Sequence, residues 1–154
     1  MSNIEAKLTS LGISLPAAAT PVANYVGFVK SGNQVFLSGQ LPLENGELKF
    51  SGKVGSKVSV DEAKQAAKIC AINLLAQLKL ACEGDLDRVT RCIKLGVFVN
   101  GDADFTDHPA VANGASDLIA EVFGDAGKHA RAAVGSGSLP RGVCVEVDAI
   151  FEIK

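Results

Sequence analysis

The sequence predicts an α+β fold in which two helices cover one face of a sheet. Apolar and polar residues alternate from Val143 to Ile153, which is typical of a strand with one buried face. Ser59-Val60-Asp61-Glu62 is a capping box, and apolar residues at helical spacing after it predict a helix that ends before Gly84. A second helix is expected over about Pro109–Phe123. Both helices can cover the same sheet face, which leaves the other face for a different partner to cover.

The N-terminal part of the chain predicts a short helix, a connector and paired strands. Ser2 is a suitable N-cap for the helix, and Gly12 is suited to end it. Two prolines and four alanines over 15–23 indicate an extended connector. Turn residues then separate the strands. The expected elements are a helix to Leu11, the connector, strands over Tyr25–Lys30 and Gln34–Ser38, and a tight turn at Glu44–Glu47.

The remaining elements give the order β-β-(β)-α-β-α-β-β. A long strand is expected over Thr90–Val99, broken by the turn residues 100–102, and a loop over Gly124–Lys128. With 154 residues the chain is most simply one domain, 1–154, long enough to bury a core. Within it, 1–21 forms the N-terminal helix and connector, and 22–153 forms the core.

Apolar side chains exceed what a small monomer needs. Hydrophobic residues make up 47% of the chain and charged residues 21%, with a mean hydropathy of +0.24. No apolar run reaches the roughly 18 residues of a membrane span, and residues 1–15 lack the continuous apolar core of a secretory signal. The surplus is therefore expected in a subunit interface. We expect a cytoplasmic oligomer without a membrane partner.

Charge and cysteine spacing exclude two classes of function. The net charge is −2 and the pI about 5.7, so nothing builds the basic stripe that binds nucleic-acid phosphates. The four cysteines are widely spaced and no histidines are paired, which argues against a metal site. Most of the cysteines lie in apolar periodic segments, where a free thiol behaves as a small buried hydrophobe. No nucleic-acid partner, metal or cofactor is expected.

Arg131 and Glu146 are the candidate site residues of the C-terminal segment. They lie 15 residues apart across a Gly/Ser/Pro-rich turn, so they would converge on one end of the sheet if the flanking strands are neighbours. An arginine there can bind a carboxylate through two parallel hydrogen bonds, and a glutamate can hold or activate water. Two structural alternatives stay open. Arg131 can reach out to solvent or pair with Glu146, and Glu146 can be an edge-strand charge that keeps the sheet soluble.

Three blocks of sequence resemble the Rid family, also called YjgF-type or perchloric-acid-soluble proteins. The C-terminal block has the family's signature residues at its spacing. A second block resembles the first hairpin of the family, and a third resembles its middle strand and the entry to its second helix. The blocks are Ala130-Arg131, Leu139-Pro140, Glu146 and Ala149; then Val35–Pro42; then Val97–Val99, Asp104-Phe105 and Asn113.

The resemblance implies a fold and a set of site residues. The fold would be chorismate-mutase-like, in a homotrimer whose sheets surround a central barrel and whose clefts lie between subunits. Arg131 would bind the carboxylate of a small 2-imino acid, while the main chain of Ala133 and the carboxylate of Glu146 hold water. The residues that would line the substrate are Tyr25, Ser38, Gly39 and Asn113. Tyr25 is the only tyrosine in the chain, and without the resemblance it could equally be a core residue whose hydroxyl has a hydrogen-bond partner at the edge of the core.

The function that the resemblance implies is hydrolysis of reactive enamine and imine acids to 2-oxo acids and ammonia, with no cofactor. Where many family deaminases have Arg-Ser-Cys, this chain has Arg131-Ala132-Ala133, so the thiol is missing but the main chain is kept. His129 is expected in a solvated loop, close enough to Arg131 to tune the cleft. A non-catalytic trimer that binds small 2-oxo or amino acids is the alternative. Endoribonuclease activity is a distant third, because the chain has no basic face.

Overall fold

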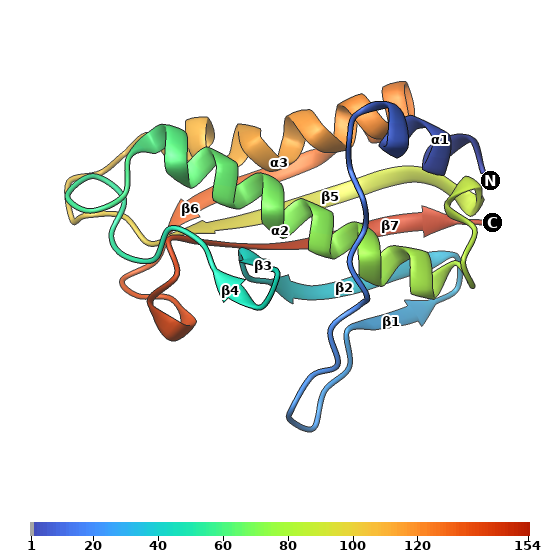
Figure 1. Cartoon of the computed structure of the whole chain (residues 1–154), viewed down its shortest axis with the longest axis horizontal. Coiled ribbons are helices and arrows are strands. Elements are labelled where there is room, and N and C mark those ends of the chain that lie inside the picture. The colour runs from blue at the N-terminus through green and yellow to red at the C-terminus, as the bar shows by residue number, and fades with distance from the viewer. Residues whose placement is uncertain (1) are drawn as a thin grey trace.

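The structure of the chain is a computed structural model that describes residues 2–154. Two long helices lie side by side across one face of a sheet, and the chain termini lie at the same end of the molecule (Figure 1). The helices are α1 (Asn3–Ser10), α2 (Val60–Ala81) and α3 (His108–Phe123). The strands are β1 (Phe28–Ser31), β2 (Gln34–Gln40), β3 (Leu43–Glu44), β4 (Glu47–Leu48), β5 (Val89–Val99), β6 (Ala130–Gly135) and β7 (Val145–Ile153). Three short 3₁₀ turns are η1 (Leu86–Arg88), η2 (Gly124–Gly127) and η3 (Pro140–Gly142).

The main sheet has five strands in the order β1-β2-β7-β5-β6. All neighbours are antiparallel except β5 and β6, which run parallel because α3 crosses over between them. Strands β1 and β6 are therefore the two edges of the sheet. The α+β class predicted from the sequence is confirmed, and the small β3–β4 hairpin lies outside the main sheet.

Strand β7 separates a covered face from an open one. Its residues are alternately buried and half-buried along all nine positions, as the alternating sequence predicted. Val145, Val147 and Ala149 face the helices, whereas Glu146 and Asp148 face the other side. In Figure 1 no helix lies on that other side within residues 2–154, so the prediction that both long helices cover one face is confirmed.

Helix α2 begins and packs as the sequence predicted. The hydroxyl of Ser59 accepts from the amide of Glu62, and the amide of Ser59 donates to the Glu62 carboxylate, at 3.1 and 3.0 Å. Small buried residues bring α2 close to its neighbours. The tightest approach is to Gly114 of α3, where a Cβ atom would lie 1.9 Å from the carbonyl oxygen of Lys64. Gly114 is therefore needed for the packing of α2 against α3.

The first hairpin differs from its prediction at both ends. Strand β1 begins at Phe28 rather than Tyr25, and β2 continues to Gln40. The reason is a register shift between Leu37 and Gln40, which bulges β2 at Ser38 and Gly39. Just before β1, the carbonyl of Gly27 still accepts from the amide of Ser38 in β2 (2.9 Å). The bulge shapes one part of the candidate site.

The cysteines are structural, as predicted. All four are buried and free of disulfides. Burial raises the pKa of Cys92 and Cys144 to about 12 and raises that of Cys70 well above its ordinary value. These thiols are therefore held protonated. Of the helices described, none is both long and apolar enough to span a membrane.

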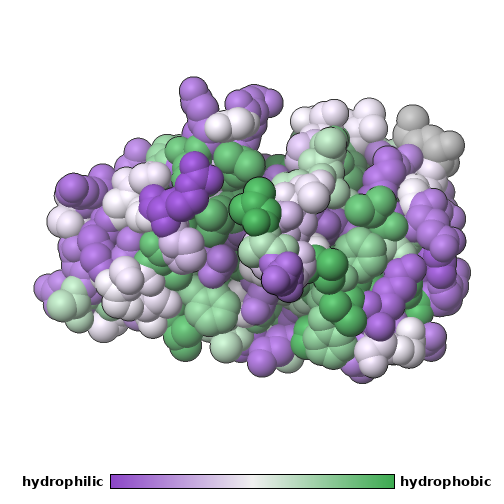
Figure 2. All heavy atoms as spheres, turned by 90° about the horizontal axis from the view of Figure 1, so that it is seen from below, coloured by the Kyte–Doolittle hydropathy of each residue, from purple (hydrophilic) through white to green (hydrophobic). Residues whose placement is uncertain are grey.

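Apolar side chains remain exposed near β1 and the connector before it. Val22, Tyr25, Val26 and Val29 are all more than half exposed. Figure 2 shows the molecule from below, where hydrophobic side chains gather over the middle of the surface between more hydrophilic ends. On the open sheet face, Val29 is in register with Phe36 of β2, which is 41% exposed and itself opposite Ile150 of β7. This row is a surface that an oligomer could bury.

Candidate active site

The predicted site residues form two groups at different places on the sheet. We name Arg131, Ala133 and Asn113 the arginine half, and Glu146, Gly39, Ser38 and Tyr25 the glutamate half. Glu146 on β7 is two strand spacings from β6 and the bulge of β2 is three, so the two halves are roughly 10 to 14 Å apart. The two groups cannot both contact one small molecule within a single chain.

The expectation that Arg131 and Glu146 converge is wrong within the chain. It assumed that the strands flanking the Gly/Ser/Pro-rich turn are neighbours, but β6 pairs with β5 instead of β7. Arg131 is opposite Leu95, which faces the helices, whereas Glu146 is opposite Phe98 on the open face. The two side chains therefore lie on opposite faces. The alternative of an Arg131–Glu146 ion pair is wrong for the same reason.

The arginine half is held in place by helix α3. Nη1 of Arg131 donates to Oδ1 of Asn113 at 2.8 Å and to Oγ of Ser116 at 3.1 Å. Nε and Nη2 have no hydrogen-bond partner within residues 2–154, and the residue is exposed. The free Nε–Nη2 edge is the pair of parallel donors that a carboxylate accepts. Arg131 is thus oriented by its own chain yet open to an anion.

The free edge of β6 adds a main-chain donor beside Arg131. The amide of Ser136, just after β6, donates to the carbonyl of Val99 in β5 at 2.8 Å. Amide directions alternate along a strand, so the amides of Arg131 and Ala133 point away from β5, out of the sheet. The Ala133 side chain lies opposite Val97 on the helix side. The main-chain group expected to hold substrate or water is therefore available.

His129 is ordered, not solvated as expected. Its Nε2 lies 2.9 Å from Oγ of Ser116, and its Nδ1 lies 2.6 Å from the carbonyl oxygen of Gly127. Ser116 was not predicted as a site residue. The available signal was its position three residues after Asn113, which places both on one face of a helix, together with a histidine two residues before Arg131.

The glutamate half is built around the β2 bulge. A Cβ atom at Gly39 would lie 3.0 Å from Cδ of Glu146, so glycine at this position makes room for the carboxylate. Desolvation by burial raises the pKa of Glu146, and the neighbouring Asp148 raises it further. No ion pair of Glu146 is found in the described part of the chain. Its carboxylate is a base whose proton affinity is increased by its surroundings.

Ser38 and Tyr25 join the connector to the bulge. The hydroxyl of Ser38 donates to the carbonyl of Val26 at 2.6 Å, which fixes the connector beside β2. Tyr25 directly precedes Val26 in the chain, and its side chain is 58% exposed. The alternative that Tyr25 is a core residue is therefore wrong. A tyrosine on this surface is free to contact a ligand.

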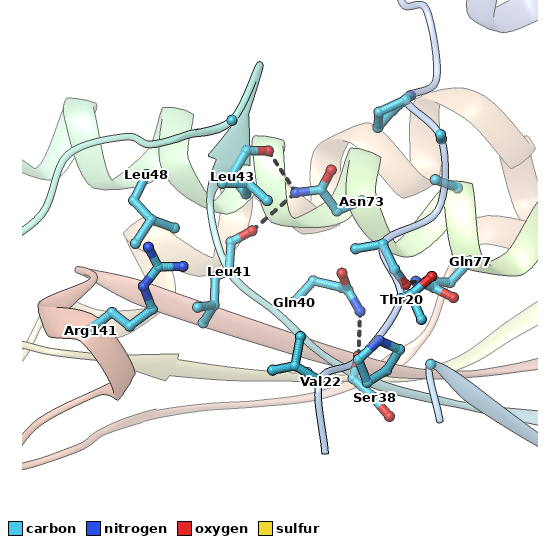
Figure 3. Close-up of a pocket in the computed structure, with 18 of the residues that line it drawn as sticks. Thr20, Val22, Ser38, Gln40, Leu41, Leu43, Leu48, Asn73, Gln77 and Arg141 are labelled. Carbon is cyan, nitrogen blue, oxygen red and sulfur yellow. Dashed lines mark hydrogen bonds between the residues drawn. The ribbon is translucent and has the colours of Figure 1, made fainter. Parts of the chain in front are cut away.

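A cavity of about 400 Å³ adjoins the glutamate half. Asn73 donates to the carbonyls of Leu41 and Leu43, and Gln77 donates to that of Ala19, so two side-chain amides of α2 hold the walls. Figure 3 shows Arg141 reaching toward Leu48 at one end of the cavity, and Gln77 beside Thr20 at the other. Tyr25, Ser38 and Gly39 also line this cavity.

The sequence interpretation missed Asn73, Gln77 and Arg141. The signal for the first two was a pair of amides four residues apart in the otherwise apolar stretch 69–78 of the helix. Arg141 gave no comparable signal. Within residues 2–154, no group of three or more His, Cys, Asp or Glu side chains is placed to hold a metal ion.

Comparison with known proteins places the chain in a family. A family model described as "YjgF/chorismate mutase-like, putative endoribonuclease" matches residues 5–151. Protein TCP17 of Trypanosoma cruzi is 50% identical over 152 residues, 98% of this chain and 94% of that protein. A 2-iminobutanoate/2-iminopropanoate deaminase of Dermatophagoides farinae is 29% identical over 142 residues, 92% of this chain and 95% of that protein.

The solved structures agree with this placement. The protein Atu1372 of Agrobacterium tumefaciens superposes with a TM-score of 0.92 at 51% identity, covering 98% of this chain and 92% of that one. The chain belongs to the YjgF/chorismate mutase-like family. The resemblance to the Rid family is thereby confirmed, and so is a chorismate-mutase-like α+β fold with three helices and a mixed sheet.

Proposed function

We propose that this member of the YjgF family hydrolyses 2-imino acids, and the enamines from which they form, to 2-oxo acids and ammonia. The observation that supports the proposal most directly is the open Nε–Nη2 edge of Arg131, beside the outward-pointing amide of Ala133. Together they form a receptor for a substrate carboxylate on a free sheet edge. The similarity to a relative named 2-iminobutanoate/2-iminopropanoate deaminase supports the same substrate class.

The proposal includes a homotrimer with a central barrel and clefts between subunits. The two halves of the site are too far apart in one chain, so a small substrate can contact both only if the β6 edge of one subunit meets the β2 bulge of another. The exposed apolar side chains around β1 and on the open sheet face are the surface that such an assembly would bury.

In the proposed reaction the two halves have different tasks. Arg131 and the Ala133 amide bind the carboxylate and fix the C=N bond beside the glutamate half of the partner subunit. There Glu146 takes a proton from water as the water oxygen adds to the imine carbon, and passes a proton to the nitrogen. The carbinolamine then loses ammonia and leaves a 2-oxo acid. A raised pKa suits a carboxylate that must both accept and return a proton.

The cavity beside Gly39 is the proposed place of the substrate side chain. The cavity is lined by Ser38 and Gly39 of the bulge, by apolar side chains and by the charged side chain of Arg141. No metal or cofactor enters the proposed reaction, because the imine is already reactive and needs positioning and charge complementarity.

The test is a coupled assay of the decay of 2-iminopropanoate and 2-iminobutanoate. Arg131→Ala should lower the specificity constant by roughly 10² to 10⁴, since charge-assisted hydrogen bonds of this kind are each worth about 1.5–3 kcal/mol. Arg131→Lys should recover only a small part, because a point charge cannot reproduce the fork. Circular dichroism and sedimentation must show that the variants are folded and assembled as the parent is. Activity of Arg131→Ala within about threefold of the parent would reject the proposal.

The same experiment separates catalysis from ligand binding alone. A protein that binds 2-oxobutanoate through Arg131 but does not accelerate imine decay would be the non-catalytic alternative. Endoribonuclease activity, which the description of the family model names, is not proposed. A net charge of −2 and a pI of about 5.7 do not favour binding to a phosphate backbone.

A further inference from the structure

We propose that Ser116 and His129 are positioning residues that hold the guanidinium of Arg131 with its carboxylate-binding edge outward. The inference rests on the proposed role of Arg131 as a carboxylate receptor. It adds two residues that do not touch the substrate but decide how the receptor is oriented.

Arg131 needs such support because of its place in the fold. It lies on an edge strand and is exposed, so neighbouring strands restrict its long side chain on one side only. A flexible arginine would have to be ordered each time an anion binds, which lowers affinity. Contacts that fix it beforehand reduce this cost.

The supporting contacts form a continuous chain of hydrogen bonds from the main chain to the guanidinium. The carbonyl of Gly127 can only accept, so Nδ1 of His129 bears the proton in that 2.6 Å contact. In the neutral ring Nε2 is then an acceptor, and the Ser116 hydroxyl donates to it at 2.9 Å. The lone pairs of Ser116 Oγ remain for Nη1 of Arg131 at 3.1 Å. Each group thus has a defined direction of donation.

The far end of this chain is fixed by packing. Gly127 is buried, and a Cβ atom there would lie 2.4 Å from the carbonyl oxygen of Ile119 in α3. Glycine therefore lets the turn press against the helix, and its carbonyl has little freedom to move. His129 is anchored to this carbonyl and Ser116 to α3 itself. The orientation of Arg131 is therefore determined by groups that are fixed to helix α3.

A histidine is suited to this position because its two ring nitrogens act in opposite senses. In the neutral ring, Nδ1 donates to Gly127 and Nε2 accepts from Ser116. If the side chains are superposed, the side-chain amide of asparagine lies where Nδ1 of histidine is, and the side-chain amide of glutamine lies where Nε2 is. His129→Asn can thus keep the contact with Gly127 but not the one with Ser116, whereas His129→Gln can offer an acceptor to Ser116.

The experiment measures binding of 2-oxobutanoate and of its neutral amide, 2-oxobutanamide, by calorimetry. Ser116→Ala and His129→Asn should each weaken the carboxylate about five- to thirty-fold, with little change for the amide, because only the carboxylate uses the fork. His129→Gln should recover most of the loss. The double variant should be no weaker than the worse single variant by more than about threefold, since both residues act through one contact. In the deaminase assay the single variants should raise KM more than they lower kcat.

Ser10→Ala is the matched control. It removes a hydroxyl that also bonds within a helix, to the carbonyl of Lys7, but lies on α1 away from both halves. Binding of 2-oxobutanoate by this variant should equal that of the parent. Equal losses for the carboxylate and the amide would indicate a general structural defect and overturn the inference.

A second measurement does not depend on the proposed function. In ¹⁵N-labelled protein, the guanidinium NMR signals of Arg131 should report slower rotation and slower proton exchange than those of Arg141. Both differences should become smaller in Ser116→Ala, in which only the contact with Asn113 remains. If Arg131 in the parent is as mobile as Arg141, the inference is wrong whatever the protein binds. If the NMR signals of Arg131 behave as expected but Arg131→Ala leaves carboxylate binding unchanged, the proposed function fails and the inference stands.

Discussion

The two halves of the candidate site are stabilised in opposite ways. Arg131 is exposed and is held by two side chains of α3, Asn113 and Ser116, of which Ser116 is in turn linked to His129. Glu146 is half-buried, has no ion pair within residues 2–154, and has a pKa raised by desolvation. The cation is therefore fixed in direction and exposed to solvent, whereas the anion is partly buried and its pKa depends on its neighbours.

This difference follows from the physical chemistry of the two groups. A guanidinium stays charged at any physiological pH, so an exposed site costs little and leaves it open to a ligand. A carboxylate becomes a better base as it loses water, so partial burial suits a group that must move protons. In the proposed function, one half therefore binds the substrate and the other transfers protons. Our predictions test whether these tasks belong to separate chains.

The largest effect is expected from mixing two inactive variants. Arg131→Ala removes the arginine half and Glu146→Gln removes the base of the glutamate half, so each variant alone should be nearly inactive. If each cleft takes its halves from different subunits, a subunit-exchanged 1:1 mixture should regain activity in about a quarter of its clefts. The measurement is imine hydrolysis after unfolding and joint refolding.

The control is the double variant Arg131→Ala/Glu146→Gln mixed with the parent protein. Each of its subunits lacks both halves, so it can form intact clefts only between two parent subunits. It should dilute activity without restoring any. Absence of recovery in the first mixture, with exchange proven by mass spectrometry, would mean that both halves act within one subunit.

A large effect on assembly is expected from Phe36→Glu. Phe36 lies between Val29 and Ile150 on the open sheet face, and an unpaired charge buried there should cost about 3 kcal/mol or more per interface. Sedimentation at micromolar concentration should show a shift from trimer to monomer. Leu80→Glu is the matched control, since Leu80 is an exposed residue of helix α2. A trimer that survives Phe36→Glu would exclude the open face from the interface.

The fold was predictable because most of its signals are local. The capping box of α2 and the alternation of β7 each depend on a few adjacent residues, and the structure confirms both elements. The boundary of β1 was not predictable, because it depends on a register shift in another strand. Strand pairing was likewise beyond reach. The Gly/Ser/Pro-rich turn suggested that β6 and β7 are neighbours, but the long crossover through α3 allows β6 to run parallel to β5.

The sequence allowed site residues to be proposed but not their geometry. The proposed residues came from motifs, whereas Ser116, Asn73, Gln77 and Arg141, which the structure places around them, belong to no motif. Their separation could not be foreseen, because it depends on which strand lies beside β6. The contact between Ser116 and His129 joins a helix to a loop 13 residues later. Neither residue type alone distinguishes such a contact from two solvated side chains.

A moderate effect is expected from Gly39→Ala, which tests the glutamate half alone. The added Cβ would lie 3.0 Å from Cδ and 3.1 Å from Oε1 of Glu146, so the carboxylate must shift by a few tenths of an ångström. We expect kcat to fall about tenfold, because the water it holds is misplaced. Affinity for 2-oxobutanoate should stay near that of the parent, since the arginine half is untouched. Gly137→Ala, whose Cβ would meet nothing within 4 Å, should change neither quantity.

The smallest effect is expected from Asp148→Asn. The sign of its effect on the free energy of unfolding should differ from that of the same change at Asp87. Burial raises the pKa of Asp148 from 3.8. The folded state therefore binds this proton more tightly than the unfolded state, and the free energy of unfolding falls as pH rises through that raised pKa. Removing the charge should stabilise the protein at pH 7, by no more than about 1 kcal/mol because water still screens a half-exposed group.

Asp87 provides the opposite case in the same molecule. Its carboxylate accepts from the amides of Ile4 and Asn3 at 2.9 Å, and these bonds lower its pKa. Asp87→Asn should therefore destabilise the protein at pH 7, with the difference vanishing as pH falls through the lowered pKa. Thermal unfolding from pH 3 to pH 7 compares the two variants.

Because Asp148 also raises the pKa of Glu146, Asp148→Asn should move the acid limb of the pH–activity profile to lower pH. An unchanged limb would mean that Glu146 is not the group that titrates during turnover, whatever happens to stability.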